Sequence, residues 1–256
     1  FAAPPSADAF TGRELRSPKF PSGDFNFLFG ILTAPISSES CSLLVVALNI
    51  SSDLYSILCW SPGSKRWVEL NLVGSPEVMS LVVFKGQVFG MDSLYRVLVI
   101  DLAPRMSWRL LDAKLSTGTF LYNYYGKFGQ NLVECNGELF VVLLIPTGKF
   151  SLPGSPKIEV YSLDFSESVW VKKESLGDWC LFMDAVGKCS FACRDPGRWG
   201  GRKNCVYVAG PGYAGWSVFP LDGEAIDTSE ESPLKSWYVT LPRWPSPVWV
   251  YPSMLL

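Results

Sequence analysis

The chain has 256 residues, of which 48% are hydrophobic and 18% charged, and its formal net charge at pH 7 is −2. This composition excludes a disordered chain and gives no overall positive field for nucleic acid or an anionic membrane. The sequence contains no His, which excludes Ser-His-Asp and Cys-His catalysis, His-ligated metal sites and imidazole acid–base chemistry.

The N-terminal residues 1–40 are rich in Pro, Ser and Gly, and they predict at most a short strand at 27–32. The first residues, FAAPPSADAFTGRELRSPKF, lack both an initiating Met and the charged-then-apolar layout of a secretory signal. We therefore expect part of the protein to lie upstream of residue 1. No apolar run approaches the roughly 20 residues that cross a bilayer, so we expect no membrane partner.

Strand and turn signals recur from residue 41 onward. Apolar and β-branched runs alternate with turns such as Lys85-Gly86 and Asn136-Gly137, and Asn-Gly between two apolar runs is a strong hairpin signal. The predicted strands are 41–49, 54–60, 67–70, 79–84, 87–91, 95–102, 108–111, 131–135, 138–145, 158–163 and 170–173. Long stretches with helical periodicity are absent, so the sequence predicts an all-β protein.

Three segments share one pattern, in which a strand and a loop lead to a strand that begins near Trp67, Trp108 or Trp170. These Trp residues are 41 and 62 residues apart, and an insert at 146–156 matches the longer interval. Turn glycines at 86, 137 and 187 recur with spacings of 51 and 50. Four strands in 40–50 residues is the spacing of a β-propeller blade. A β-sandwich with irregular meanders is the alternative.

The repeated Trp residues are expected to be structural. A large aromatic side chain at the start of an outer strand can pack between neighbouring blades and bury much apolar area. Stacking against a ligand is the alternative role.

We interpret residues 1–256 as a single β-propeller of four-stranded, kelch-like blades. Residues 1–40 would form a partial opening blade or linker, so the first blade is expected to be incomplete. Residues 228–256 contain two candidate strands that would close the ring, because an open sheet edge invites aggregation.

The seven Cys residues indicate free thiols in a reducing compartment, because their number is odd and none are spaced as C-x-x-C. Four of them, Cys180, Cys189, Cys193 and Cys205, could in principle bind Zn²⁺. The paired knuckles of structural zinc sites are absent, so we expect no metal and no cofactor. The scattered carboxylates show no catalytic pair, and we expect no enzyme.

The densest basic feature is the loop at 194–203, RDPGRWGGRK. Arg beside an exposed Trp is a frequent hot-spot composition at protein interfaces. A solvated loop is an equally open reading, and binding of single-stranded nucleic acid is a weaker one. Tyr213, in a Gly-rich turn, is a further candidate for ligand contact. The candidate partner-binding residues are Arg194, Arg198, Trp199, Arg202, Lys203 and Tyr213.

Several motifs extend over most of the chain. They are FTGREL at 10–15, LVECNGELFVV at 132–142, the run from Val160 through Trp170 to Phe182, KNCVY at 203–207 and WVYP at 249–252. With these motifs the chain resembles the plant F-box proteins that carry a KIB-type β-propeller, also called domain of unknown function 295. The segment 132–209 carries the most specific part of the resemblance.

The resemblance implies a receptor that presents a target protein to an SCF-type ubiquitin ligase in the nucleus or cytoplasm. No F-box lies in these residues, so a Skp1-type adaptor would bind only through an upstream F-box. One alternative is a member without an F-box that acts as a structural or assembly subunit in a plastid or mitochondrion. Another is a propeller that binds a small ligand or sugar.

Overall fold

The fold is described from a computed structural model of the chain. The structure describes residues 6–7, 14–15, 17–21, 25–34, 38, 41–50, 52–74, 77–94, 96–115, 130–145, 148–149, 152–153, 157–184, 190–209 and 216–222. These residues form β-strands and one 3₁₀ helix, so the predicted all-β class is confirmed. The predicted closing strands at 228–256 lie outside the described residues, and that assignment remains a prediction.

The first two sheets are antiparallel, and in each the strands follow one another in chain order. The first consists of β3 (Phe25–Leu32), β4 (Leu43–Asn49), β5 (Leu54–Trp60) and β6 (Val68–Asn71). The second consists of β7 (Val78–Phe84), β8 (Gln87–Asp92), β9 (Val97–Asp101) and β10 (Ser107–Leu111). Strand β3 comes from the segment 1–40 assigned to a partial blade, and β4, β5 and β6 complete its sheet.

The third sheet has the order β11–β17–β16–β13–β12, with β11 parallel to β17 and the other neighbours antiparallel. Its strands are β11 (Lys114–Leu115), β12 (Gln130–Cys135), β13 (Glu138–Ile145), β16 (Lys157–Asp164) and β17 (Val169–Lys173). The insert at 146–156 contains a small sheet of its own, β14 (Gly148–Lys149) and β15 (Leu152–Pro153). A second small sheet joins β1 (Ser6–Ala7) to β2 (Glu14–Leu15).

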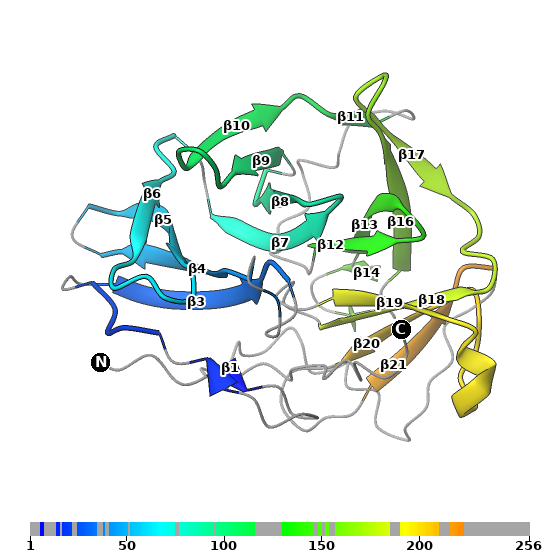
Figure 1. Ribbon diagram of the computed structural model, residues 1–256. Helices are drawn as coiled ribbons and strands as arrows, with labels where there is room; N and C mark the ends of the chain where they lie inside the picture. The colour runs from blue at the N-terminus through cyan, green and yellow to red at the C-terminus, as the bar shows by residue number, and fades with distance from the viewer. Residues whose placement is uncertain are drawn as a thin grey trace.

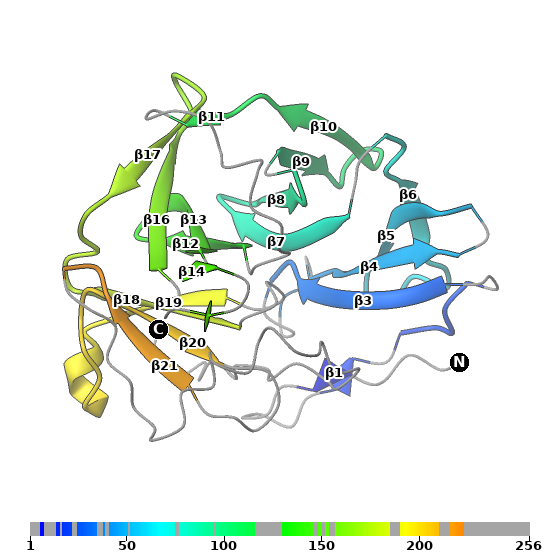
Figure 2. The same cartoon turned by 180° about the vertical axis from the view of Figure 1, so that it is seen from behind.

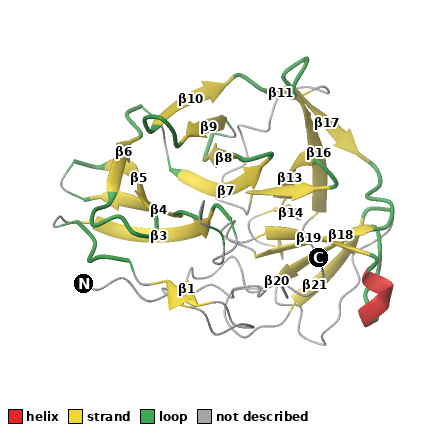
Figure 3. Cartoon of the chain, in the orientation of Figure 1, coloured by secondary structure: helices red, strands yellow, loops and turns green. Residues whose placement is uncertain are grey.

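The fourth sheet departs from chain order. Its strands are β18 (Trp179–Asp184), β19 (Ser190–Arg194), β20 (Cys205–Ala209) and β21 (Trp216–Pro220), with η1 (Pro196–Trp199) between β19 and β20. The spatial order is β19–β18–β20–β21, so β18 lies between β19 and β20 and runs parallel to β20. The connection that contains η1 therefore crosses from one side of β18 to the other. Figure 3 shows η1 as the helical segment beside this sheet.

The four sheets stand around a common centre, with β7 and β12 nearest to it in Figure 1 and in the reverse view of Figure 2. Strand β12 packs against β7 on one side and β19 on the other. Hydrogen bonds join these inner strands: Leu132 N donates to Ser80 Oγ at 3.0 Å, and Ser190 Oγ donates to the carbonyl of Leu132. This is the blade arrangement of a β-propeller, which confirms the predicted fold class.

Two hairpin turns confirm the reasoning from sequence. Asn136 and Gly137 both have positive φ, 53° and 75°, as do Lys85 and Gly86, at 48° and 77°. Two successive residues of positive φ match the twist of antiparallel strands, and Asn and Gly adopt that conformation at low cost. The third predicted turn glycine, Gly187, lies outside the described residues.

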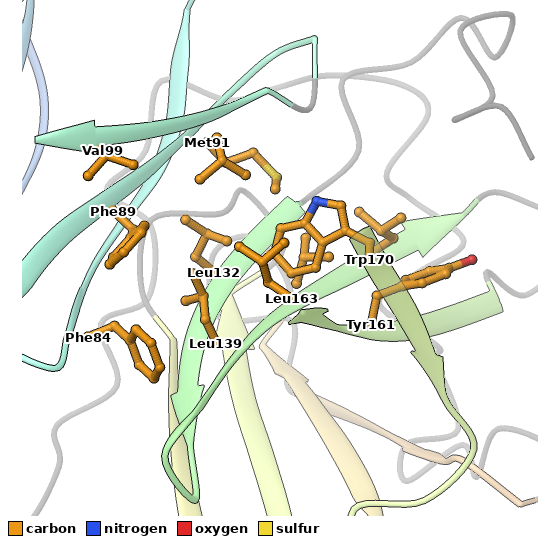
Figure 4. Packing of buried hydrophobic residues seen from close by; sticks show 12 residues of the cluster. Phe84, Phe89, Met91, Val99, Leu132, Leu139, Tyr161, Leu163 and Trp170 are labelled. Carbon is orange, nitrogen blue, oxygen red and sulfur yellow. The ribbon is translucent and has the colours of Figure 1, made fainter. Parts of the chain in front are cut away.

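Apolar clusters fill the space between successive sheets. One joins the first two sheets, another the second and third, and a third the third and fourth. Trp170 has no exposed surface and belongs to the cluster between the second and third sheets. Figure 4 shows its ring beside Leu163. The expected role of Trp170 as a spacer between blades is confirmed.

The other two repeated Trp residues also contact segments that come earlier in the chain. Trp108 Nε1 donates to the carbonyl of Asn71, in the outer strand of the first sheet, at 3.2 Å. Trp67 Nε1 donates to the carbonyl of Pro18 at 3.1 Å, and its ring stacks on Phe20 with centroids 4.8 Å apart. The segment 17–21 thus packs on the first sheet much as each sheet packs on the next.

No helix in the part of the chain that the structure describes has the length and apolar composition needed to cross a membrane.

Candidate functional site

A cavity of about 540 Å³ opens beside the inner strands of three sheets. Val82 of β7, Glu134 of β12 and the whole of β19 line it, together with Trp179, Asp195, Arg198 and Trp199. We call this space the inner-strand cavity. Three of the predicted binding residues, Arg194, Arg198 and Trp199, therefore lie on one concave surface.

Main-chain hydrogen bonds hold the start of the basic loop. Asp195 adopts a left-handed conformation with φ of 50°, and its N–H donates to the carbonyl of Asp178 at 3.0 Å. Its own carbonyl accepts from Arg198 N at 3.1 Å, which closes the 3₁₀ turn. Pro196 follows at the first helical position, where its missing N–H costs nothing. The direction in which η1 leaves β19 is thereby fixed.

The end of the loop is anchored as firmly. Asn204 N donates to the carbonyl of Trp179 at 2.8 Å, and its side-chain Oδ1 accepts from Leu176 N at 2.8 Å. Arg202 N donates to the Tyr207 hydroxyl at 2.6 Å, and that hydroxyl donates to the carbonyl of Arg202 at 3.3 Å. A loop bound at both ends presents its side chains with little ordering cost on binding.

Trp199 is the exposed aromatic residue of this site, with 44% of its surface accessible. Its ring meets Tyr207 edge to face, with centroids 5.9 Å apart, and lies 5.8 Å from Phe182. Gly201 lies against the ring so closely that an added Cβ would be 2.1 Å from it. A side chain at position 201 would therefore displace the ring, and glycine there lets Trp199 keep its place.

Beneath Trp199 three aromatic rings stack across neighbouring strands. Phe182 lies opposite Phe191 on one side and opposite Tyr207 on the other, with centroids 4.7 Å apart in both pairs. Offset stacking of this kind adds about 0.5–1.5 kcal/mol per pair beyond the area that is buried. The exposed Trp thus rests on a packed aromatic layer.

The cations of the basic loop differ in the ion pairs that they form. Arg194 Nε is 3.8 Å from Asp195 Oδ2, a pair whose side chains are 69% and 49% exposed. Lys203 Nζ pairs with Asp178 Oδ1 at 3.2 Å on the open surface, away from the cavity lining. Arg198 has no ion pair with any residue that the structure describes. Its guanidinium is therefore the one most available to a partner among these three cations.

Carboxylates balance the cations on the cavity wall. Glu134 is exposed, and its Oε1 accepts a hydrogen bond from Gly137 N at 3.0 Å. With Arg194, Arg198 and Asp195 it gives a wall of mixed charge rather than a basic patch. Such a wall favours charged hydrogen bonds with a protein over tracking of a phosphate backbone.

Three thiols form a row on one face of the fourth sheet. Cys180 lies opposite Cys193 in β19 and opposite Cys205 in β20, and all three are buried. Among the described residues no group of His, Cys, Asp or Glu side chains is arranged to hold a metal ion. Cys189, the fourth residue weighed as a zinc ligand, lies outside the described residues.

The structure brings together only part of the predicted binding set. Arg194, Arg198 and Trp199 line the cavity, whereas Arg202 and Lys203 lie in the loop beyond it. Tyr213 lies outside the described residues. Sequence reasoning missed Val82 and Glu134, which reach the site through the packing of β7 and β12. It also missed Trp179, although the SLGDW run that leads into β18 could have indicated it.

Comparison with known proteins gives one family. A family model described as the KIB1-4 β-propeller matches residues 7–232. No curated protein matches the chain.

Proposed function

We propose a function from one premise: the chain belongs to the KIB1-4 β-propeller family. A KIB1-4 β-propeller is suited to protein interaction, because a rigid ring of sheets carries loops that vary independently of it. In our proposal this propeller is not an enzyme, and it recognises a target protein for an F-box-type ubiquitin ligase in the nucleus or cytoplasm. A Skp1-type adaptor would bind through a segment outside residues 1–256.

One observation carries the proposal of a binding face. The inner-strand cavity combines an exposed, packed Trp199 with Arg198, which has no ion pair among the residues that the structure describes, on a loop whose main chain is anchored at both ends. Trp and Arg are the residues that most often dominate binding energy at protein interfaces. A partner loop that enters the cavity would desolvate both side chains without reordering the propeller.

We expect Arg198→Ala and Trp199→Ala each to weaken target binding by about 30-fold or more, the effect of losing one interface hot spot. Targets are first identified by mass spectrometry of proteins recovered with the full-length protein from plant extract, and their Kd values are then measured by calorimetry. Arg109→Ala is the matched control, because Arg109 is exposed on β10 of another sheet. Unchanged Kd values for both cavity variants would contradict this binding face.

The ligase role has a separate test. The full-length gene product is expected to recover a Skp1-type adaptor from the same extract, and the Arg198→Ala variant is expected to recover it equally well. Adaptor binding that is lost with the cavity, or never seen with the full-length protein, would contradict the receptor role. The cavity would then serve a partner outside the ubiquitin system.

A further inference from the structure

The row of thiols in the fourth sheet contains one pair that lies opposite across two antiparallel strands. Cys180 and Cys193 face each other across the antiparallel β18–β19 pair, and the Cys193 Sγ donates to the carbonyl of Arg194 at 3.5 Å. Residues opposite each other in antiparallel strands have Cα atoms about 4.5–5.5 Å apart, which lies within the range that a disulfide spans. The pair can therefore be bridged with little movement of the backbone.

The two thiols differ in access. Cys193 lines the inner-strand cavity and keeps 7% of its surface exposed, whereas Cys180 has none. Burial, and then the neighbouring thiols Cys193 and Cys205, raise the pKa of Cys180. Cys180 is thus kept as a neutral thiol that solvent does not reach, and a reagent that enters the cavity meets Cys193 first.

The third thiol, Cys205, lies on the other side of Cys180, in the parallel strand β20. Cys205 is 2% exposed and does not line the cavity. Its Sγ donates to the carbonyl of Lys203 at 3.2 Å, in the basic loop. Burial also raises the pKa of Cys205. Cys205 therefore serves as an internal comparison for the pair.

We propose that Cys193 and Cys180 are a redox modification site, in which a hydroperoxide that enters the inner-strand cavity converts the two thiols to a disulfide. Cys193 is the residue oxidised first, and Cys180 is the resolving thiol. The proposal does not depend on the ligase role, because it rests on the register of β18 and β19 and on the cavity alone.

The chemistry balances with hydrogen peroxide as the oxidant. The Cys193 sulfur, as its thiolate, attacks one peroxide oxygen, the O–O bond breaks, and sulfenic acid and one water are formed once a proton is taken up. The Cys180 sulfur then attacks the Cys193 sulfur, the S–O bond breaks, and a second water leaves. Two thiols and one peroxide thus give one disulfide and two waters, and a dithiol reductant restores both thiols.

The bond would change the cavity wall. It would tie β19 to β18 directly beside Arg194, which follows Cys193 in the chain and lines the same cavity. Strand β19 would lose conformational freedom at its end, where the basic loop begins. Oxidation would therefore act on the wall that the proposed target contacts, without contact with Trp199 itself.

The test treats the full chain with hydrogen peroxide, alkylates the remaining thiols and maps the linked peptides by mass spectrometry. We expect the loss of two of the seven thiols, one peptide link between Cys180 and Cys193, and full recovery after reduction. The Cys205→Ser variant is the matched control and is expected to form the same link.

Two variants assign the roles. In Cys180→Ser we expect Cys193 to stop at the sulfenic acid and to be trapped by dimedone. In Cys193→Ser we expect no dimedone adduct on Cys180 and no link between Cys180 and Cys205. A wild-type link from Cys180 to Cys205, a dimedone adduct on Cys180, or intact thiols at both 180 and 193 in the peroxide-treated wild type would overturn the proposal.

Discussion

Replacing Trp170 with alanine is expected to lower the free energy of unfolding by about 3–5 kcal/mol, the range for large buried aromatic residues. The indole has no exposed surface and fills the space between the second and third sheets. Its removal leaves a cavity between two rigid sheets, which cannot close without moving one whole blade against the other. Chemical denaturation followed by Trp fluorescence and circular dichroism measures the change, with the slope of unfolding checked for two-state behaviour.

Trp170→Phe is the informative companion. Trp170 Nε1 has no hydrogen-bond partner among the residues that the structure describes, so phenylalanine removes volume but no hydrogen bond. We expect a clearly smaller loss for Phe than for Ala. A loss below about 1 kcal/mol for Trp170→Ala would mean that this side chain is not the spacer between blades.

Replacing Arg96 with alanine is expected to destabilise the protein by about 1–3 kcal/mol, the range for leaving a buried polar group without its hydrogen-bond partner; the Arg96 side chain is itself 33% exposed. Asp92 is completely buried at the end of β8, and Arg96 Nε donates to its Oδ2 at 2.8 Å. Without the Arg96 side chain, the carboxylate keeps, among the described residues, only the main-chain N–H groups of positions 94 and 96, both bonded to Oδ1. Oδ2 would then be a buried charged oxygen with no partner among the residues that the structure describes.

A double-mutant cycle separates this penalty from the value of the pair. Asp92→Asn removes the charge, so Arg96→Ala should cost clearly less in that background than in the native protein. Arg109→Ala, on an exposed outer strand, is the surface control and should change stability by less than about 0.5 kcal/mol. Equal costs in the two backgrounds would contradict the burial of an ionised Asp92.

Local sequence signals predicted much of the fold, because the hairpins are set by residues that are adjacent in the chain. Asn136-Gly137 and Lys85-Gly86 stand at turns of positive φ where the sequence placed them. The burial of Trp170 followed from its position in a repeated strand pattern. These features depend on pleat period and turn chemistry, which the sequence displays directly.

The order of strands in the fourth sheet could not be predicted in this way. Nothing in the β19 sequence indicates that it pairs beside β18 on the central side while β20 pairs on the other. Glu134 joins the candidate site only because β12 packs between β7 and β19. The composition of the sequence identified the basic loop. Only the three-dimensional arrangement showed that the loop lines the cavity as far as Trp199 and that Arg202 and Lys203 lie beyond it.

The positions of the Trp residues also determine when each interface between sheets can form during synthesis. Trp108 docks on a sheet that precedes it, and Trp170 fills the next interface 62 residues later. Translation at roughly 5–20 residues per second takes roughly 3–12 seconds to add these residues. During that time the second sheet lacks the Trp170 indole that packs against it. The part of the second sheet that Trp170 later covers is open to chaperones and to aggregation during that interval.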